Sequence, residues 1–308
     1  QGQVGDLMLE NSRVRFVVQR PLPHIAVSSQ FGGNVIDADL RRPPGEAGRD
    51  VFGELGFLMN LAGTVKAESV EVERAGGPGK QAVVVTRGGY DLSGYFILGP
   101  AAQTMIGFDP FSLRGVDLDR PWPIRFEVRY ILFPDSPALR VELTVRNMSE
   151  NPVPLLLAYF VQGGQVNLFL PGRSAFGAED LDAADRIFFD PVEPKIPVGY
   201  GLVPDGRMDR FLLAMLGAQA LLHEGTLADL ALFPDRAPDT VSPGGSLTLG
   251  SYFVVGEDVD RAIETAQQVA DQKACTPVLG LVTEEETGLP IEGANVTALR
   301  MPGAVFFS

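Results

Sequence analysis

The sequence predicts an all-β protein, a large antiparallel β-supersandwich with one C-terminal helix and a short β extension. Glycine, with 35 residues, and proline, with 24, interrupt the chain throughout and mark frequent turns. Between the turns lie short segments in which apolar and polar residues alternate, the period of a strand with one buried face. A stretch of helical spacing near the end supplies the helix.

Composition excludes several classes of partner. Lys and Arg number 25 against 39 Asp and Glu, so the net charge is -14. Phosphate backbones and anionic lipids repel so acidic a chain, and we expect no nucleic-acid partner. The longest apolar stretches, such as residues 154–161, are shorter than the roughly 18 residues that cross a bilayer, so we expect no membrane span. The single cysteine, Cys275, excludes an internal disulfide and a cysteine metal cluster.

The first strands follow from alternation. Residues 13–18 place three apolar side chains on one face, and residues 124–132 and 139–146 repeat the pattern on either side of a Pro- and Asp-containing turn. These two longer strands form an antiparallel hairpin. Opposite charges stabilise a cross-strand pair and like charges destabilise it, so we predict that Arg129 lies opposite Glu142 and not opposite Arg140.

The later segments are less regular. Residues 147–152 predict a further turn, and residues 153–161 then lose the alternation, which predicts one strand covered on both faces. Residues 209–233 fit a buried helix or strands, but Gly217 and Gly225 divide them at strand lengths and favour strands.

Residues 256–274 predict the helix. Asp258 is a suitable N-cap. One face carries apolar residues at helical spacing: Val259, Ala262, Ile263, Ala266, Val269 and Ala270. The helix closes the main domain, which gives a β-supersandwich domain over residues 1–275 and a partial β segment over residues 276–308.

The last segment, "GLVTEEETGLPIEGANVTALR" (residues 280–300), resembles the start of a carboxypeptidase regulatory-like domain, a small transthyretin-like β-sandwich. The matching residues are Gly280, Val282, Thr287, Gly288, Pro290, Ile291, Gly293, Ala294 and Val296. Such a module needs more strands to bury a core. We therefore expect either that the chain is part of a longer one or that these strands dock on the main domain.

Residues 1–275 are similar in layout to the galactose mutarotase-like supersandwich. The resemblance rests on "IRFEVRYILFPDSPALRVELTVRNMSENPVPLLLAYF", residues 124–160. In mutarotases the strand after this turn leads to a catalytic histidine, whereas residues 155–167 offer Tyr159 and Gln162. No catalytic residue carries over.

The opening of the chain, in residues 5–19, 32–40 and 52–61, looks like the leader of large secreted bacterial proteins that end in a PHP-type metallohydrolase. The resemblance implies a secreted or periplasmic location and a downstream domain in a longer parent chain. The first residue is Gln1, which fits either a mature secreted product or a trimmed part of a longer chain.

Carboxylates are the main candidates for chemistry. Asp37 and Asp39 share a strand face, and Asp50 and Glu54 follow a short connection, so the four acids would suit calcium or an acid and base pair for sugar chemistry. The alternative is a solvated face on which Arg41, Arg42 and Arg49 are their partners. We expect no other metal and no cofactor. The only histidines, His24 and His223, lie far apart in the sequence and exclude a histidine-rich metal site.

Aromatic residues are the second set of candidates. Phe contributes 19 residues against 6 Tyr and 1 Trp, which favours a core over a sugar-stacking surface. Trp122, between two prolines, is the candidate stacking platform, with Tyr90 and Tyr95 as companions.

The scarcity of reactive groups favours a non-catalytic extracytoplasmic module that binds a carbohydrate or a partner and is accessory to a downstream hydrolase domain. One alternative is a carbohydrate-active enzyme, an epimerase or a lyase, that uses Asp37, Asp39 and Glu54 as acid and base. Another is a structural or assembly protein of the cell exterior.

Overall fold

The structure is a computed structural model. It describes residues 2–22, 31–49, 51–59, 63–91, 123–155, 157–163, 166–170, 175–176, 186–191, 198–205, 211–216, 239–271 and 281–291. Within these residues it confirms an all-β sandwich with one C-terminal helix. No helix in the described part of the chain is long and apolar enough to span a membrane.

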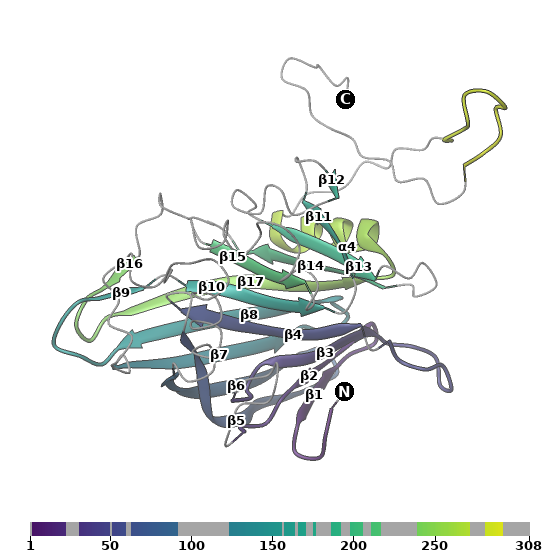
Figure 1. The fold of residues 1–308 in the computed structure, drawn as a ribbon. Coiled ribbons are helices and arrows are strands. Elements are labelled where there is room, and N and C mark those ends of the chain that lie inside the picture. Colours follow the sequence, from purple (N-terminus) through teal and green to yellow (C-terminus); the bar gives the residue numbers. More distant parts are fainter. Residues whose placement is uncertain are drawn as a thin grey trace.

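The chain folds into two layers of one continuous sheet (Figure 1). The first layer contains β1 (Leu7–Glu10), β2 (Val14–Val18), β3 (Val35–Leu40), β4 (Phe52–Met59), β10 (Leu157–Gly163) and β15 (Phe211–Leu216). Pairing of β4 with β5 leads into the second layer. Among the described strands, β10 and β15 are the one parallel pair.

The second layer is longer. It contains β5 (Gly63–Gly77), β6 (Lys80–Asp91), β7 (Ile124–Leu132), β8 (Ala138–Asn147), β17 (Ser246–Gly256), β14 (Gly199–Pro204), β13 (Ile187–Pro191), β11 (Val166–Leu170) and β12 (Ala175–Phe176). A separate two-stranded sheet pairs β9 (Val153–Leu155) with β16 (Asp239–Val241).

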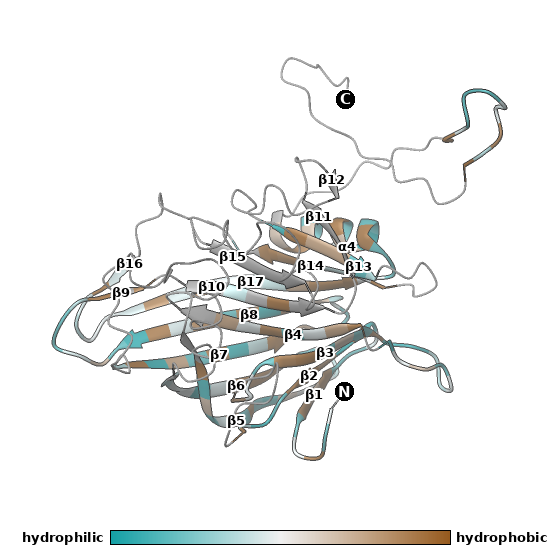
Figure 2. Cartoon of the chain, viewed as in Figure 1, coloured by the Kyte–Doolittle hydropathy of each residue, from teal (hydrophilic) through white to brown (hydrophobic). Residues whose placement is uncertain are grey.

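The predicted hairpin has the predicted register. β7 and β8 pair antiparallel with Arg129 opposite Glu142, and Arg140 lies opposite Ile131. Hydrophobic and hydrophilic residues alternate along both strands in Figure 2. The guanidinium of Arg129 nevertheless forms ion pairs with Glu73, which lies on β5, and with Glu127, which lies two residues earlier on β7.

One predicted strand is divided. Residues 153–161 were expected to form a single strand, but β9 ends at Leu155 in the small sheet and β10 begins at Leu157 in the large one. The expectation was wrong because an uninterrupted apolar run does not show where a strand changes sheet. The turn before it is confirmed: the buried Asn147 accepts a hydrogen bond from the Ser149 backbone. In the 209–233 segment the described part is strand β15, as favoured.

Aromatic side chains fill the space between the layers. Phe253 of β17 contacts Phe16 and Phe52 of the first layer, with ring centroids 6.0 and 4.9 Å away. All three side chains are fully buried. The Phe-rich composition therefore serves the core, where tilted ring pairs add to the free energy of burial.

Two tyrosine hydroxyls join the layers. Tyr130 of β7 donates to the Gly33 carbonyl at 2.8 Å, and Tyr200 of β14 donates to the Ala38 carbonyl at 2.9 Å. Gly33 has φ +82°, and a Cβ there would lie 2.5 Å from the Thr86 methyl group. Only glycine permits this conformation and this close approach at the entry to β3.

The helix is confirmed as α4 (Val259–Ala266), followed by a π-helical turn over Gln267–Asp271. The Asp258 side chain accepts from the Arg261 backbone at 2.7 Å, which is the expected N-cap. The helix packs on β13, β14 and β17 at one end of the second layer (Figure 1). A Cβ at Gly199 would lie 2.2 Å from the Asp258 backbone, so glycine permits the helix to pack this closely.

The segment that resembles a regulatory-like domain is described over residues 281–291. It forms a tight turn closed by an antiparallel bridge between Thr283 and Pro290, with Gly288 at φ +69°. Leu281 and Leu289 are 73% and 64% exposed. The boundary between the two predicted domains stays a prediction.

The tyrosine bonds yield a test of how the layers are joined. Tyr200→Phe keeps the ring but removes the hydroxyl that reaches β3, so the free energy of unfolding should fall by about 1–2 kcal/mol. Tyr130→Phe should cost less, because Thr86 Oγ1 still donates to the Gly33 carbonyl. Urea titrations measure both. Wild-type midpoints in both variants would contradict this role of the hydroxyls.

Candidate functional site

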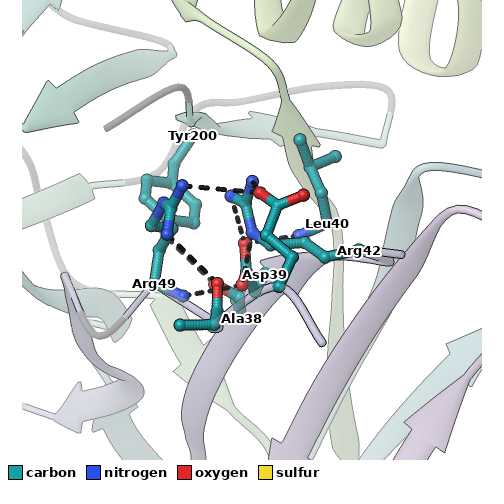
Figure 3. A network of polar contacts seen from close by, with 8 residues as sticks. Ala38, Asp39, Leu40, Arg42, Arg49 and Tyr200 are labelled. Carbon is teal, nitrogen blue, oxygen red and sulfur yellow. Dashed lines mark hydrogen bonds and ion pairs between the residues drawn. The ribbon is translucent and has the colours of Figure 1, made fainter. Parts of the chain in front are cut away.

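The site begins with the carboxylate of Asp39 at the end of β3 (Figure 3). Its two oxygens accept from Arg42 Nη2 and Nε, at 2.8 and 3.1 Å, and Oδ2 also accepts from the Arg49 backbone at 2.8 Å. Asp39 and Arg42 are each about one-tenth exposed at the side chain. A bidentate pair this sheltered holds both side chains in a fixed geometry.

The loop after β3 wraps around this pair. Glu46 lies 3.3 Å from Arg42 Nη1 and 3.4 Å from Arg49 Nη2, so one carboxylate connects the two guanidinium groups. Burial lowers the pKa of Arg42, but the hydrogen bonds and charges of Asp39 and Glu46 outweigh it and raise the pKa overall. Arg42 is therefore always charged, and it anchors the loop.

A groove of about 830 Å³ opens between this loop and helix α4. Its walls come from four parts of the chain: Ser12 and Arg13 before β2; Leu40 at the end of β3 with Arg41, Arg42, Pro43 and Glu46 after it; Pro137 before β8; and Val255 to Glu257 with Arg261, Glu264, Thr265 and Gln268 at the helical end. This volume lies within the range of about 300–1,000 Å³ that is typical of ligand sites.

The lining mixes hydrogen-bond donors with acceptors. Arg261 pairs with Glu264 at 2.6 Å, and Arg41 pairs with Glu10 at 2.7 Å. Arg13 is exposed, and its side chain has no ion-pair partner among the described residues. The ion pairs hold four of the charged side chains in place, while the five N–H donors of Arg13 face solvent.

A second polar centre lies between β3 and β4. Asn34 Nδ2 donates to Glu54 Oε1 at 2.6 Å, and the two residues are 2% and 1% exposed. Burial raises the pKa of Glu54 to about 8, although the bond from Asn34 works against it. Glu54 is therefore mostly protonated at neutral pH. Glu54 Oε2 and Asn34 Oδ1 have no hydrogen-bond partner among the described residues.

The structure separates the predicted acids. Asp39 is held by Arg42 and Arg49, two of the partners named in the alternative, but it is buried and does not lie on a solvated face. Glu54 is held by Asn34. Asp37 is half-buried on β3 opposite Val17. In the described part of the chain no group of three or more His, Cys, Asp or Glu side chains could hold a metal ion.

The predicted aromatic platform is placed only in part. Tyr90 belongs to the hydrophobic core and is 7% exposed, so its ring does not offer a face to solvent. Trp122, Tyr95 and Asp50 lie outside the described residues, as do His24, His223 and Cys275.

Sequence reasoning missed most of the groove. Arg13 and Arg261 are separated by more than two hundred positions and have no common motif. The one available signal is the group of arginines at 41, 42 and 49, which the sequence presents as partners of the acids.

Comparisons with known proteins give distant structural similarities. No protein-family model and no curated protein matches the chain. The chain is similar to the Slr1438 protein from Synechocystis sp. PCC 6803, with 12% identity over 83% of this chain and 97% of that chain, at a TM-score of 0.44.

Two further similar structures have galactose mutarotase in their names. One is a galactose mutarotase-like protein from Clostridium acetobutylicum, with 9% identity over 81% of this chain and 94% of that chain, at a TM-score of 0.40. The other is a galactose mutarotase related enzyme from Lactobacillus acidophilus, with 10% identity over 83% and 99%, at 0.36. At TM-scores this low, none of these similarities assigns an activity to the chain.

The protonated carboxyl predicts a pH dependence of stability. Between about pH 4.5 and 8 the folded protein holds the Glu54 proton and the unfolded chain releases it. The free energy of unfolding should therefore fall as pH rises through this window, by about 1.4 kcal/mol per pH unit. Glu54→Gln carries no charge and should lose this contribution to the slope.

Urea titrations from pH 5 to 9 measure the effect. The variant should match wild type near pH 5 and exceed it at pH 8 by about 3–4 kcal/mol. Parallel pH profiles for the two proteins would contradict a protonated Glu54.

Proposed function

We propose that the chain is a non-catalytic, extracytoplasmic β-sandwich module that binds a carbohydrate in the groove beside α4 and is accessory to a downstream hydrolase domain. The observation that carries this proposal is the lining of the groove. Guanidinium, carboxylate, amide and hydroxyl groups from the loop after β3 and from the helical end converge on one space. A sugar presents hydroxyls that both donate and accept, so it matches such a lining better than an apolar ligand does.

The non-catalytic part of the proposal rests on the carboxylates. Acid and base catalysis of sugar chemistry uses two carboxyl groups on either side of the reacting bond. Asp39 accepts hydrogen bonds from Arg42 and from the loop backbone, and Glu54 is almost completely buried and hydrogen-bonded to Asn34. Of the three glutamates that line the groove, Glu264 and Glu46 are paired with arginines and Glu257 is exposed.

A second candidate is a carbohydrate-active enzyme that uses Glu54 as an acid. The raised pKa of Glu54, about 8, favours it, because a general acid must hold its proton at the working pH. An activity assay with aldoses and polysaccharides tests this candidate. Turnover by wild type that is lost in a folded Glu54→Gln variant would support the enzyme over the module.

Calorimetric titration against a panel of neutral and acidic glycans tests the module. We expect wild type to bind one class, and Arg13→Ala and Arg261→Ala to weaken that binding about tenfold or more, because hydrogen bonds to charged groups contribute about 1.5–3 kcal/mol.

Arg125→Ala is the matched control. Arg125 is also an exposed arginine in an ion pair, with Glu68, but it lies on β7 outside the groove. It should leave the affinity unchanged. Absence of binding by wild type, or equal loss in all three variants, would count against the proposal.

A further inference from the structure

A smaller hollow of about 300 Å³ adjoins the groove. It lies where three turns meet: the turn between β1 and β2, the glycine-rich tip between β5 and β6, and the turn between β7 and β8. Ser12 lines both spaces, with Arg13 on the groove side and Asn11 on the side of the hollow. The β1–β2 turn is therefore a ridge between two adjacent binding spaces.

This ridge is held firmly. Asn11 Nδ2 donates to the carbonyls of Phe133 and Ser136 at 2.9 and 2.8 Å, so the first layer is bonded to the β7–β8 turn. Ser12 Oγ donates to Asp135, the one described non-glycine residue with a positive φ. A ligand that crosses the ridge meets a surface already in place, which lowers the entropy lost on binding.

The hollow contains the aromatic surface that the groove lacks. Phe133 lines it and is 37% exposed, whereas the ring pairs among the described aromatic residues lie in the core. An exposed ring offers an apolar face to the C–H face of a sugar. Lys80, also exposed, adds a cationic donor at the rim.

We propose that the ligand is an oligosaccharide that runs from the groove across Ser12 into the hollow, with Phe133 and Lys80 forming an outer subsite. This inference rests on the proposed carbohydrate binding and specifies its substrate class. A monosaccharide would occupy the groove alone, whereas a chain places further sugar units against Phe133.

Titration with cello-oligosaccharide and oligogalacturonate ladders, each from monomer to hexamer, tests the subsite. Wild-type affinity for the bound series should rise about tenfold between the shortest and the longest member. Phe133→Ala and Lys80→Ala should remove most of this rise and leave the affinity for the shortest bound member unchanged. Arg261→Ala should weaken binding at every length.

The outcomes separate the two proposals. Equal affinity at all lengths, or a length dependence that Phe133→Ala and Lys80→Ala leave intact, overturns the outer subsite while binding in the groove stands. Absence of binding at every length in both series and in the glycan panel overturns both. Thermal unfolding is the control for folding. Because both side chains are exposed, Phe133→Ala and Lys80→Ala should unfold at the wild-type temperature, so that a lost length dependence cannot come from unfolding.

Discussion

The hydrogen bond from the Tyr200 hydroxyl to the Ala38 carbonyl joins β14 to β3 across the core, and the groove takes its position from this contact. Tyr200 is fully buried and stacks on Phe253, so the hydroxyl has little freedom. Asp39 follows Ala38 and projects from the opposite face of β3. A fixed β3 thus fixes the carboxylate around which residues 41–49 fold, and that loop is one wall of the groove.

Burial decides what each arginine does. Arg125 is 54% exposed, and its pair with Glu68 lies on a solvated face, where such pairs contribute about 0–1 kcal/mol. Arg42 is 10% exposed and bonds Asp39 through two nitrogens. Little water reaches Arg42 to solvate its charge. Loss of either Arg42 or Asp39 would therefore leave the other with an unpaired, buried charge. Removal of any one exposed pair should therefore cost little stability, whereas removal of the Asp39–Arg42 pair should release the loop after β3.

Local pattern was sufficient for the fold class and insufficient for the site. Alternation located β7 and β8, cross-strand charge set Arg129 opposite Glu142, and Asp258 marked the start of α4, because each depends on neighbours in sequence. The change of sheet between β9 and β10 depends on distant strands β4, β15 and β16, which a local pattern does not specify.

The acids predicted to converge show how strand offset decides a site. Asn34 bonds Glu54, and the chain then runs five residues along β3 to Asp39, a distance of about 16–17 Å at roughly 3.3 Å per residue. The alternation in the sequence predicts which face of a strand a residue occupies. It does not predict how far along the neighbouring strand its partner lies. The same offset takes Asp39 to the end of β3, behind the groove wall, where its charge holds Arg42 and the backbone of Arg49. A carboxylate in that position shapes the groove wall, whereas Glu54 is a neutral acid in a buried site between β3 and β4.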